Sequence, residues 1–248
     1  MSEQAKTDLD ENQKLQEFSY AVSHDLGAAI RGISQLTGLL EHDISEKIND
    51  KERYWMQLIK ASADKAQSMI EAMTLYTRLA TTSESDSVLA LDNLIDNALT
   101  HCFHEAHKKS LADNLEQPLF IEPEVDFELV SIEIKAKKSH WTLLLCSLIN
   151  NALEFQKVDL SPKISIRLSL LDDNKRANLT IEDNGLGVKD EKISDICKPF
   201  SSSRDRDELH HLGMGLSYCA RIADLNQANL RFGKSRLGGF KVEYEFLV

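Results

Sequence analysis

A histidine, an asparagine and two glycine-bearing loops occur along this chain in an order that suits phosphoryl chemistry. His24 is followed directly by Asp25, and Asn151 lies more than a hundred residues later. An imidazole that is partly neutral near physiological pH can attack phosphorus. An amide oxygen is a ligand that Mg²⁺ accepts beside water and phosphates. With the two loops, this order indicates transfer of a phosphoryl group from ATP to an imidazole, although Asn151 alone also fits an ordinary helix end.

The first glycine-bearing loop contains Asp183, Gly185 and Gly187 and follows an alternating stretch typical of a strand. A carboxylate can accept a hydrogen bond from an amino group such as that of adenine. Glycines permit positive φ and a close approach of the backbone to a ligand. The loop is therefore a candidate adenine site, and a plain turn after a strand is the alternative.

The second glycine-bearing loop contains Gly213 and Gly215, directly before a helical pattern that begins at Leu216. Backbone N–H groups at a helix N-terminus can face a phosphate, although a simple helix cap is the alternative. The polar stretch between the two loops is expected to be a mobile lid. Arg204 in this stretch is a candidate phosphate ligand, or else a solvated charge.

The histidine lies in the first of two long helices that the apolar spacing predicts. Apolar residues recur three or four positions apart over residues 10–43 and again over residues 55–79, with a polar turn at 45–50. One hairpin cannot bury such a stripe by itself. We therefore expect residues 10–80 to form half of a dimeric four-helix bundle, the alternative being that the stripe packs on the rest of the chain.

The pattern changes after a polar linker at residues 81–87. We expect residues 88–248 to form a second domain in which helices and strands are mixed, an α+β sandwich rather than a doubly wound sheet. Helices are predicted at residues 88–109, 138–155 and 216–225, and strands at 119–121, 130–134, 163–171, 177–182, 229–233 and 239–248.

Composition limits the function classes. The formal net charge of -11 argues against a nucleic-acid-binding protein, which needs a basic surface. No apolar run approaches the ~20 residues that span a bilayer. Four scattered cysteines without a CxxC pair indicate reduced thiols. We expect a cytoplasmic protein that binds neither nucleic acid nor membrane.

Taken together, these motifs resemble those of bacterial sensor histidine kinases. Residues 23–26 resemble the phosphoacceptor box, 148–155 the N box, 183–187 and 213–217 the two glycine boxes, 198–200 the F box, and 238–242 the last hairpin of the ATPase fold. The resemblance implies a helical hairpin for dimerisation and histidine phosphotransfer. It also implies an ATP-binding domain of the GHKL type, in which histidine kinases, gyrase and Hsp90 share one fold.

The resemblance also implies roles. His24 would be the nucleophile, and Asp25 would orient the ring or accept its proton. Asn151 would hold Mg²⁺. ATP would be bound by Asn151, Asp183, Gly185, Gly187, Arg204, Gly213, Gly215 and Leu216. The implied partners are a second copy of the chain and the receiver domain of a response regulator. Only a short polar stretch precedes the His24 helix, so we expect a separate sensor protein acting in trans, the alternative being that a sensor domain has been removed.

Some positions depart from the family pattern. Ala28 stands four residues after the histidine, where many relatives carry a Thr or Asn that supports phosphatase activity, and Ala29 stands where the family often has a proline. Ser147 replaces an N-box asparagine, and Glu154 replaces the N-box lysine and would repel phosphates unless Lys157 compensates. Two alternatives stay open. One, motivated by Glu154, Ser147 and Ala29, is a catalytically weak dimeric scaffold with a ligand-sensitive nucleotide domain. The other is an ATPase of the gyrase and Hsp90 type, in which the His24 helix is not expected.

Overall fold

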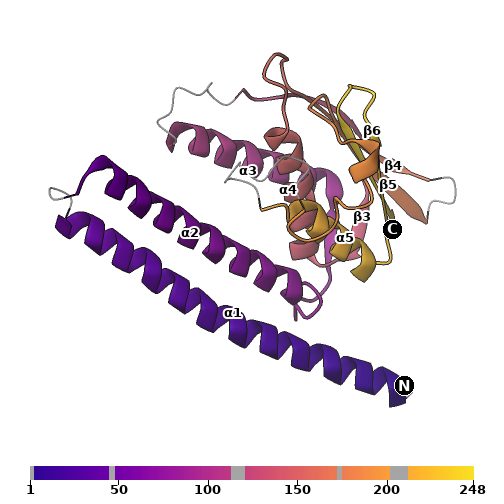
Figure 1. Ribbon diagram of the computed structural model, residues 1–248. Coiled ribbons are helices and arrows are strands. Elements are labelled where there is room, and N and C mark those ends of the chain that lie inside the picture. Colours follow the sequence, from indigo (N-terminus) through magenta and orange to yellow (C-terminus); the bar gives the residue numbers. More distant parts are fainter. Residues whose placement is uncertain (1–2, 45–47, 113–120, 172–174, 202–211) are drawn as a thin grey trace. The chain divides into compact units, whose positions relative to one another are not determined.

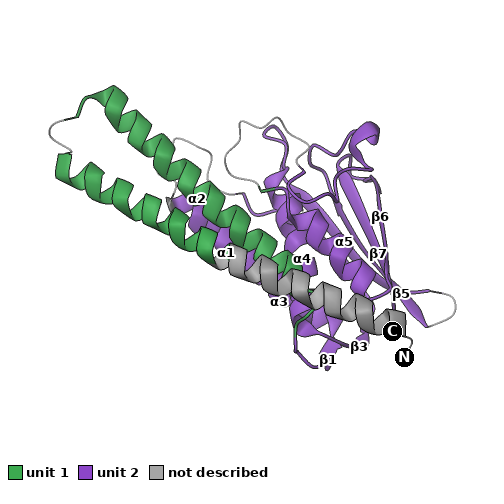
Figure 2. Cartoon of the chain, turned by 60° about the horizontal axis from the view of Figure 1, so that its bottom comes forward, with its two compact units in different colours: residues 1–82, 206–212 green, residues 83–205, 213–248 purple. Residues whose placement is uncertain are grey.

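The computed structural model describes residues 3–44, 48–112, 121–171, 175–201 and 212–248; side chains 3–22, 24 and 112 lie outside this description. The chain divides into two compact units, residues 1–82 with 206–212 and residues 83–205 with 213–248 (Figure 2). None of the helices in the described part is long and apolar enough to cross a bilayer.

The first unit is a hairpin of two long helices, α1 (Glu3–Ile44) and α2 (Asp50–Arg78) (Figure 1). Both helices occur where the apolar spacing predicts them. The start of α2 is fixed by a capping box, in which the Asn49 side chain accepts from the Glu52 N–H and the Glu52 carboxylate accepts from the Asn49 N–H. This reciprocal pair satisfies N–H groups that the first turn of a helix cannot bond internally.

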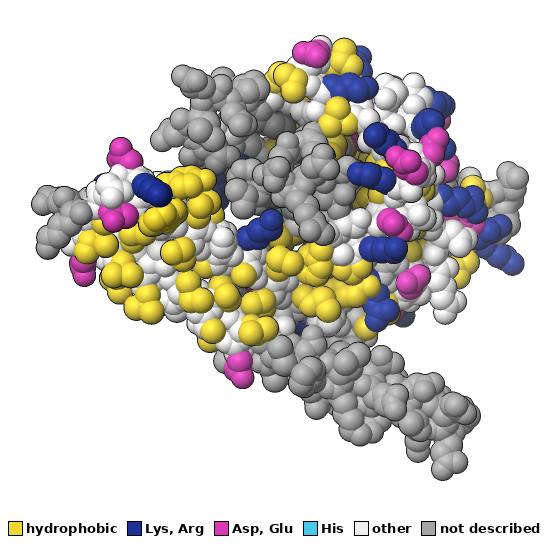
Figure 3. Space-filling view, in the orientation of Figure 1, with side chains coloured by type: hydrophobic (Ala, Val, Ile, Leu, Met, Phe, Trp, Pro, Cys, Tyr) yellow, Lys and Arg dark blue, Asp and Glu magenta, His cyan; other side chains and the backbone are white. Residues whose placement is uncertain are grey.

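The two helices meet through small and polar side chains. Ala63, Ala72 and Thr37 are buried, and Ser34 Oγ donates to Asp64 Oδ1 at 3.0 Å between the helices. The large apolar side chains instead remain on the surface, where Figure 3 shows them as yellow clusters over the hairpin. They include Leu26, Ile33, Leu36, Leu39, Leu40, Tyr54, Trp55, Leu58, Ile59, Met69 and Met73. The hairpin thus leaves most of its predicted stripe uncovered.

The second unit is an α+β sandwich, as predicted. A five-stranded sheet in the order β2-β4-β5-β7-β6 packs against helices that lie on one of its faces (Figure 1). Its elements are β1 (Ser87–Ala90), α3 (Leu91–Ala112), β2 (Glu124–Leu129), β3 (Glu133–Ala136), α4 (Lys138–Glu154), β4 (Lys163–Leu170), β5 (Arg176–Asp183), a 3-10 turn (Asp190–Lys192), α5 (Gly215–Leu225), β6 (Asn229–Lys234) and β7 (Phe240–Leu247).

The core of this unit lies between the sheet and α4. Alternate residues of β7 are buried, as the period of two requires, whereas β4 and β5 also bury residues of the opposite face, namely Ser165, Thr180 and Glu182. Trp141 on α4 packs edge-on against Tyr244 and Phe246 of β7, with ring centroids 5.5 and 4.8 Å apart. The buried face of α4 also holds Leu144, Leu148 and Ala152, so the helix that carries Asn151 is fixed against the sheet.

Three sequence predictions in this unit are wrong. Residues 87–90 form a strand that pairs with β3 rather than the first turn of a helix, and the helix begins at Leu91. Ile121 is not in a strand, while residues 119 and 120 lie outside the described residues. The strand expected at 130–134 is shifted to Glu133–Ala136.

The strand β2 was missed although its sequence alternates in the manner of a strand. Acidic residues alternate with Val125, Phe127 and Leu129, but every side chain of Glu124–Leu129 is at least partly exposed. β2 is an edge strand that pairs in parallel with β4, with Val125 opposite Ile164. Its place in the sheet therefore rests on main-chain pairing rather than on side-chain burial.

Candidate functional site

Asp183 lies at the end of β5 and is almost completely buried, at 6% exposure. Its Oδ1 atom accepts hydrogen bonds from the N–H groups of Gly185, at 2.8 Å, and Phe240, at 3.0 Å. Within the described part of the chain, Oδ2 has no hydrogen-bond partner. One carboxylate oxygen is thus fixed by the protein, and the other is available to a ligand.

The surroundings of Asp183 act on the pKa of its carboxyl group in opposite directions. Burial raises the pKa of the Asp183 carboxyl above its ordinary value, because the charged form loses hydration. The N–H groups of Phe240 and Gly185, and the charge of Lys157, favour the charged form. A buried carboxylate held in this way gains most from a ligand that donates a hydrogen bond to it.

The first glycine loop is packed against the end of α4. Leu186 donates its N–H to the carbonyl of Phe155 at 2.9 Å. A Cβ added at Gly185 would lie 2.3 Å from that carbonyl oxygen, so no larger residue fits there. Gly187 has a φ of +67°, a backbone conformation that residues with a side chain rarely adopt. The glycines are therefore required by local geometry, beyond what an ordinary turn after a strand would need.

The turn between β6 and β7 closes this loop from the other side. Gly239 donates its N–H to the Asp183 carbonyl at 3.1 Å, and a Cβ at Gly239 would lie 2.2 Å from Asp183 Oδ1. Gly239 and Phe240 belong to the site although sequence reasoning did not select them as site residues. The signal was present in the Gly-Gly-aromatic run that opens β7.

Asn151 lies on α4 with a half-exposed side chain, one turn before Phe155. Its amide makes no hydrogen bond to any residue that the structure describes. Glu154, which replaces the family's lysine, is exposed. Lys157 instead donates from Nζ to the Gly238 carbonyl at 3.2 Å, and its charge acts on Asp183. Lys157 thus brings a positive charge to the Asp183 side of the site.

The second glycine loop leads into α5. Gly213 has a φ of +66°, and a Cβ there would lie 2.2 Å from the Ser201 carbonyl oxygen. α5 begins at Gly215, whose added Cβ would lie 3.8 Å from Ser147 on α4. Leu216 follows in the first turn, where N–H groups have no partner within the helix. Helix α4 therefore borders both loops, at Ser147 and at Phe155.

The structure brings only part of the predicted site together. Asp183, Gly185 and Gly187 form one cluster, and Asn151, Gly213, Gly215 and Leu216 lie on the elements around α4. Arg204 lies outside the described residues. His24 is in α1 of the other unit, and its side chain also lies outside the description, while the neighbouring Asp25 is exposed.

Comparison with known proteins agrees with this geometry. Residues 136–247 match the family described as "Histidine kinase-, DNA gyrase B-, and HSP90-like ATPase". Cyanobacterial phytochrome A from Nostoc is 24% identical over 92% of this chain and 28% of its own length. Sensor protein QseC from Escherichia coli K12 is 22% identical over 91% of this chain and 46% of its own. The chain thus spans about a quarter to a half of these relatives.

Solved structures share the fold. The crystal structure of full-length ShkA in complex with AMPPNP aligns with a TM-score of 0.63 at 18% identity, over 93% of this chain and 45% of that one. The Acinetobacter baumannii histidine kinase AdeS aligns with a TM-score of 0.56 at 14% identity, over 88% of this chain and 94% of that one. Residues 136–247 therefore match this ATPase family, and over most of its length the chain is similar to sensor histidine kinases.

Proposed function

We propose that this protein is an ATP-dependent histidine kinase that phosphorylates its own His24 and then transfers the phosphoryl group to an aspartate of a separate response regulator. In this proposal, residues 10–80 form the dimerisation and phosphotransfer hairpin, and residues 88–248 form the catalytic ATP-binding domain. The ATPase match over residues 136–247 and the likeness to sensor histidine kinases support the reaction class, and the site geometry supports the roles of individual residues.

The observation that carries the proposal is the arrangement of Asp183. Its Oδ1 atom is held by two backbone N–H groups, and its Oδ2 atom has no partner among the described residues. An adenine amino group placed beside Oδ2 would donate the hydrogen bond that the buried carboxylate lacks. Gly185 and Gly187 let the backbone approach the base closely. Asp183 would therefore select adenine, and the glycines would shape its pocket.

Phosphates and Mg²⁺ are assigned to the elements around α4. The Asn151 amide oxygen is a hard ligand of the kind that Mg²⁺ accepts, and it makes no competing bond within the described chain. The N-terminal N–H groups of α5, at Gly215 and Leu216, favour an anion, and Gly213 allows the chain to enter the helix. Bound Mg²⁺ would neutralise charge that develops on the phosphates. Arg204 is assigned to the γ-phosphate from sequence position alone.

The chemical step is assigned to His24. A ring nitrogen forms a bond to the γ-phosphorus while the bond from that phosphorus to the ADP oxygen breaks, and the ring N–H proton leaves. Asp25, the next residue, orients the ring or accepts this proton. In the second step, a receiver aspartate attacks the phosphorus and the bond to nitrogen breaks. Positioning supplies most of the rate enhancement in such transfers.

The exposed apolar stripe of the hairpin supports a homodimer. Side chains such as Leu36, at 63% exposure, and Trp55, at 49%, lie on helices whose own contact uses small residues. A second hairpin would bury them in a four-helix bundle. A sensor protein that acts in trans would be a further partner of this dimer.

The scaffold alternative is not favoured. It was motivated by Glu154, Ser147 and Ala29, but Glu154 is exposed and Lys157 supplies a positive charge beside Asp183. The two alternatives differ in one assay. Incubation of the full chain with ATP labelled at the γ-phosphate should give a label on protein that acid removes and alkali preserves, as expected for phosphohistidine. Nucleotide binding without any such label would support the scaffold.

A further inference from the structure

The residue before Asp183 is a second buried carboxylate. Successive residues of a strand point to opposite faces of its sheet. Asp183 shares its face with the buried Leu179 and Ile181, and Glu182 therefore lies on the face away from the helices. Glu182 is nevertheless only 1% exposed. A buried glutamate on an otherwise open sheet face requires partners that compensate its lost hydration.

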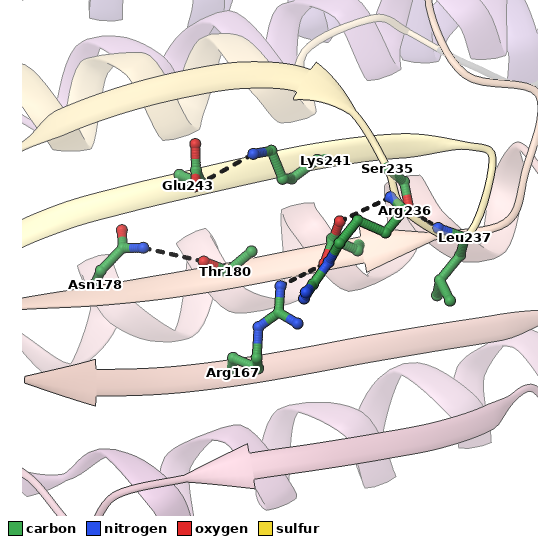
Figure 4. Close-up of polar contacts among 9 residues, drawn as sticks. Arg167, Asn178, Thr180, Ser235, Arg236, Leu237, Lys241 and Glu243 are labelled. Atoms are coloured by element: carbon green, nitrogen blue, oxygen red, sulfur yellow. Dashed lines mark hydrogen bonds and ion pairs between the residues drawn. The ribbon is translucent and has the colours of Figure 1, made fainter.

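The partners of Glu182 come mainly from one residue, Arg236. The Arg236 backbone N–H donates to Oε1 at 3.0 Å, and its guanidinium donates to Oε2 from Nε, at 3.3 Å, and from Nη2, at 3.2 Å. Arg167 on β4 also donates to Oε2. Figure 4 shows Arg167 and Arg236 converging on this point from a strand and from a turn. Glu182 is thus held by charge-assisted hydrogen bonds, which are the stronger class.

Arg236 belongs to the same turn that fixes Asp183. This turn, residues 235–239, is closed internally by the bond from Ser235 N to Gly239 O at 3.1 Å and by the bond from Leu237 N to Ser235 Oγ at 2.9 Å. Two adjacent residues of β5, on opposite faces of the sheet, therefore bind this turn. Glu182 accepts hydrogen bonds from Arg236, and Asp183 accepts them from Gly239 and Phe240.

We propose that the Glu182–Arg236 pair is a positioning clamp that sets the selectivity of Asp183 for adenine. The proposal rests on the proposed binding of ATP at Asp183. If the turn shifts, the Phe240 N–H no longer fixes Oδ1, and Oδ2 loses its orientation toward the base. Because Arg167 continues to pair with Glu182, loss of the Arg236 side chain should misplace the turn without leaving an unpaired buried charge.

The test uses the full chain and two nucleotides. Inosine triphosphate carries an oxygen where adenine carries its amino group, so the ratio of ITP to ATP dissociation constants reports on Asp183 directly. For Arg236→Gln, we expect ATP binding to weaken about five- to tenfold, as for loss of one oriented hydrogen bond, and ITP binding to change little. The selectivity ratio should fall accordingly, with KM for ATP raised and kcat nearly unchanged.

Arg231→Gln is the matched control. Arg231 lies on the neighbouring β6 and pairs with Glu245 at 3.4 Å, away from the turn. This variant should keep the affinity for both nucleotides and their ratio. Thermal unfolding of each variant verifies that it folds. If Arg236→Gln does not fold, Arg236→Lys, which keeps the charge but loses the forked geometry, should show the same fall in the ratio.

The outcomes separate the clamp from the function on which it rests. A wild-type chain that prefers ATP, together with an Arg236→Gln variant of unchanged ratio, would overturn the clamp alone. Equal weakening of ATP and ITP would also overturn it, because that result indicates general structural support. A wild-type chain that binds neither nucleotide would overturn both the clamp and the proposed function.

Discussion

The two units of this protein differ in how far their side chains are satisfied by contacts within the same unit. In the second unit, site groups are fixed by bonds within the unit, such as those from Gly185 and Phe240 to Asp183. In the hairpin, small residues make the internal contact, and large apolar side chains such as Leu36 remain exposed. The second unit, which we call the nucleotide unit because we propose that it binds ATP, can therefore form its site from one copy. The stripe of the hairpin stays exposed, which is why we propose that a second copy covers it.

Glycines show the same difference. In the nucleotide unit, a side chain at Gly185, Gly213 or Gly239 would overlap backbone or carboxylate atoms. In α1, a Cβ at Gly32 or Gly38 would meet nothing within 4 Å. The glycines of one unit are required by close approach, whereas Gly32 and Gly38 are not.

The largest effect is expected from exchanging these glycines for alanine. Gly239→Ala places a Cβ 2.2 Å from Asp183 Oδ1 and 2.5 Å from the Gly185 nitrogen. It should destabilise the nucleotide unit by about 1–3 kcal/mol and abolish measurable ATP binding. Gly32→Ala, the matched control, should instead stabilise the hairpin by roughly 0.5–1 kcal/mol. Urea unfolding and calorimetry measure both effects, and equal behaviour of the two variants would contradict the comparison.

The next largest effect on ATP binding is expected from Asp183→Asn. Loss of the charged acceptor removes a hydrogen bond worth roughly 1.5–3 kcal/mol, and ATP affinity should fall about 10- to 150-fold. Titration calorimetry measures this fall, and Asn178→Asp on the opposite face of β5 serves as a control that should leave it unchanged. An unchanged ATP affinity of Asp183→Asn would show that the first glycine loop is only a turn and does not bind adenine.

The same variant should differ from the wild type in how its stability depends on pH. Burial raises the pKa of Asp183 in the folded chain, so its ionised form costs stability once the pH rises above the ordinary aspartate value. Without nucleotide, Asp183→Asn should therefore be more stable than the wild type at pH 7. The difference should disappear as the pH falls and Asp183 is protonated in both folded and unfolded chains. Thermal unfolding across this range tests the sign, and a variant that is less stable at pH 7 would refute it.

Dimerisation tests the other side of the comparison. Leu36→Glu places a charge in the exposed stripe and should weaken the dimer on the order of 100-fold, by burying an unpaired charge at the interface. Val158→Glu is the control, because Val158 is 90% exposed in the nucleotide unit. Sedimentation of the full chain should show a monomer only for Leu36→Glu. A wild-type monomer at micromolar concentration would remove the basis for the bundle.

The smallest effect is expected at Ala28. A residue four positions after His24 lies on the same helix face, and Ala28 has no group that can hold an attacking water. Wild-type protein should therefore dephosphorylate its receiver poorly. Ala28→Thr should raise phosphatase activity with little change in phosphorylation of His24, whereas Ala29→Thr, one position further round the helix, should not. Rapid dephosphorylation by the wild type would show that another group positions the water.

Some elements of both units could be predicted from the sequence, whereas part of the second unit could not. The helices of the hairpin and the strands β4, β5 and β7 were predictable, because periodic burial leaves a direct signal. The strand β2 was overlooked although acidic residues alternate with apolar ones along it; its parallel pairing with β4 carries no such signal. The role of Gly239 was also missed, because its need arises only when β7 is brought beside Asp183, more than fifty residues earlier in the chain. Long-range close approach leaves no periodic pattern.

The central claim is that the nucleotide unit binds ATP and the hairpin supplies the acceptor. Labelling with γ-phosphate-labelled ATP, measured beside ATP affinity, tests it most directly. We expect acid-labile label on the wild type, none on His24→Gln although its ATP affinity is unchanged, and strongly reduced label on Asp183→Asn because its ATP affinity is lowered. Undiminished label on His24→Gln would show that His24 is not the acceptor.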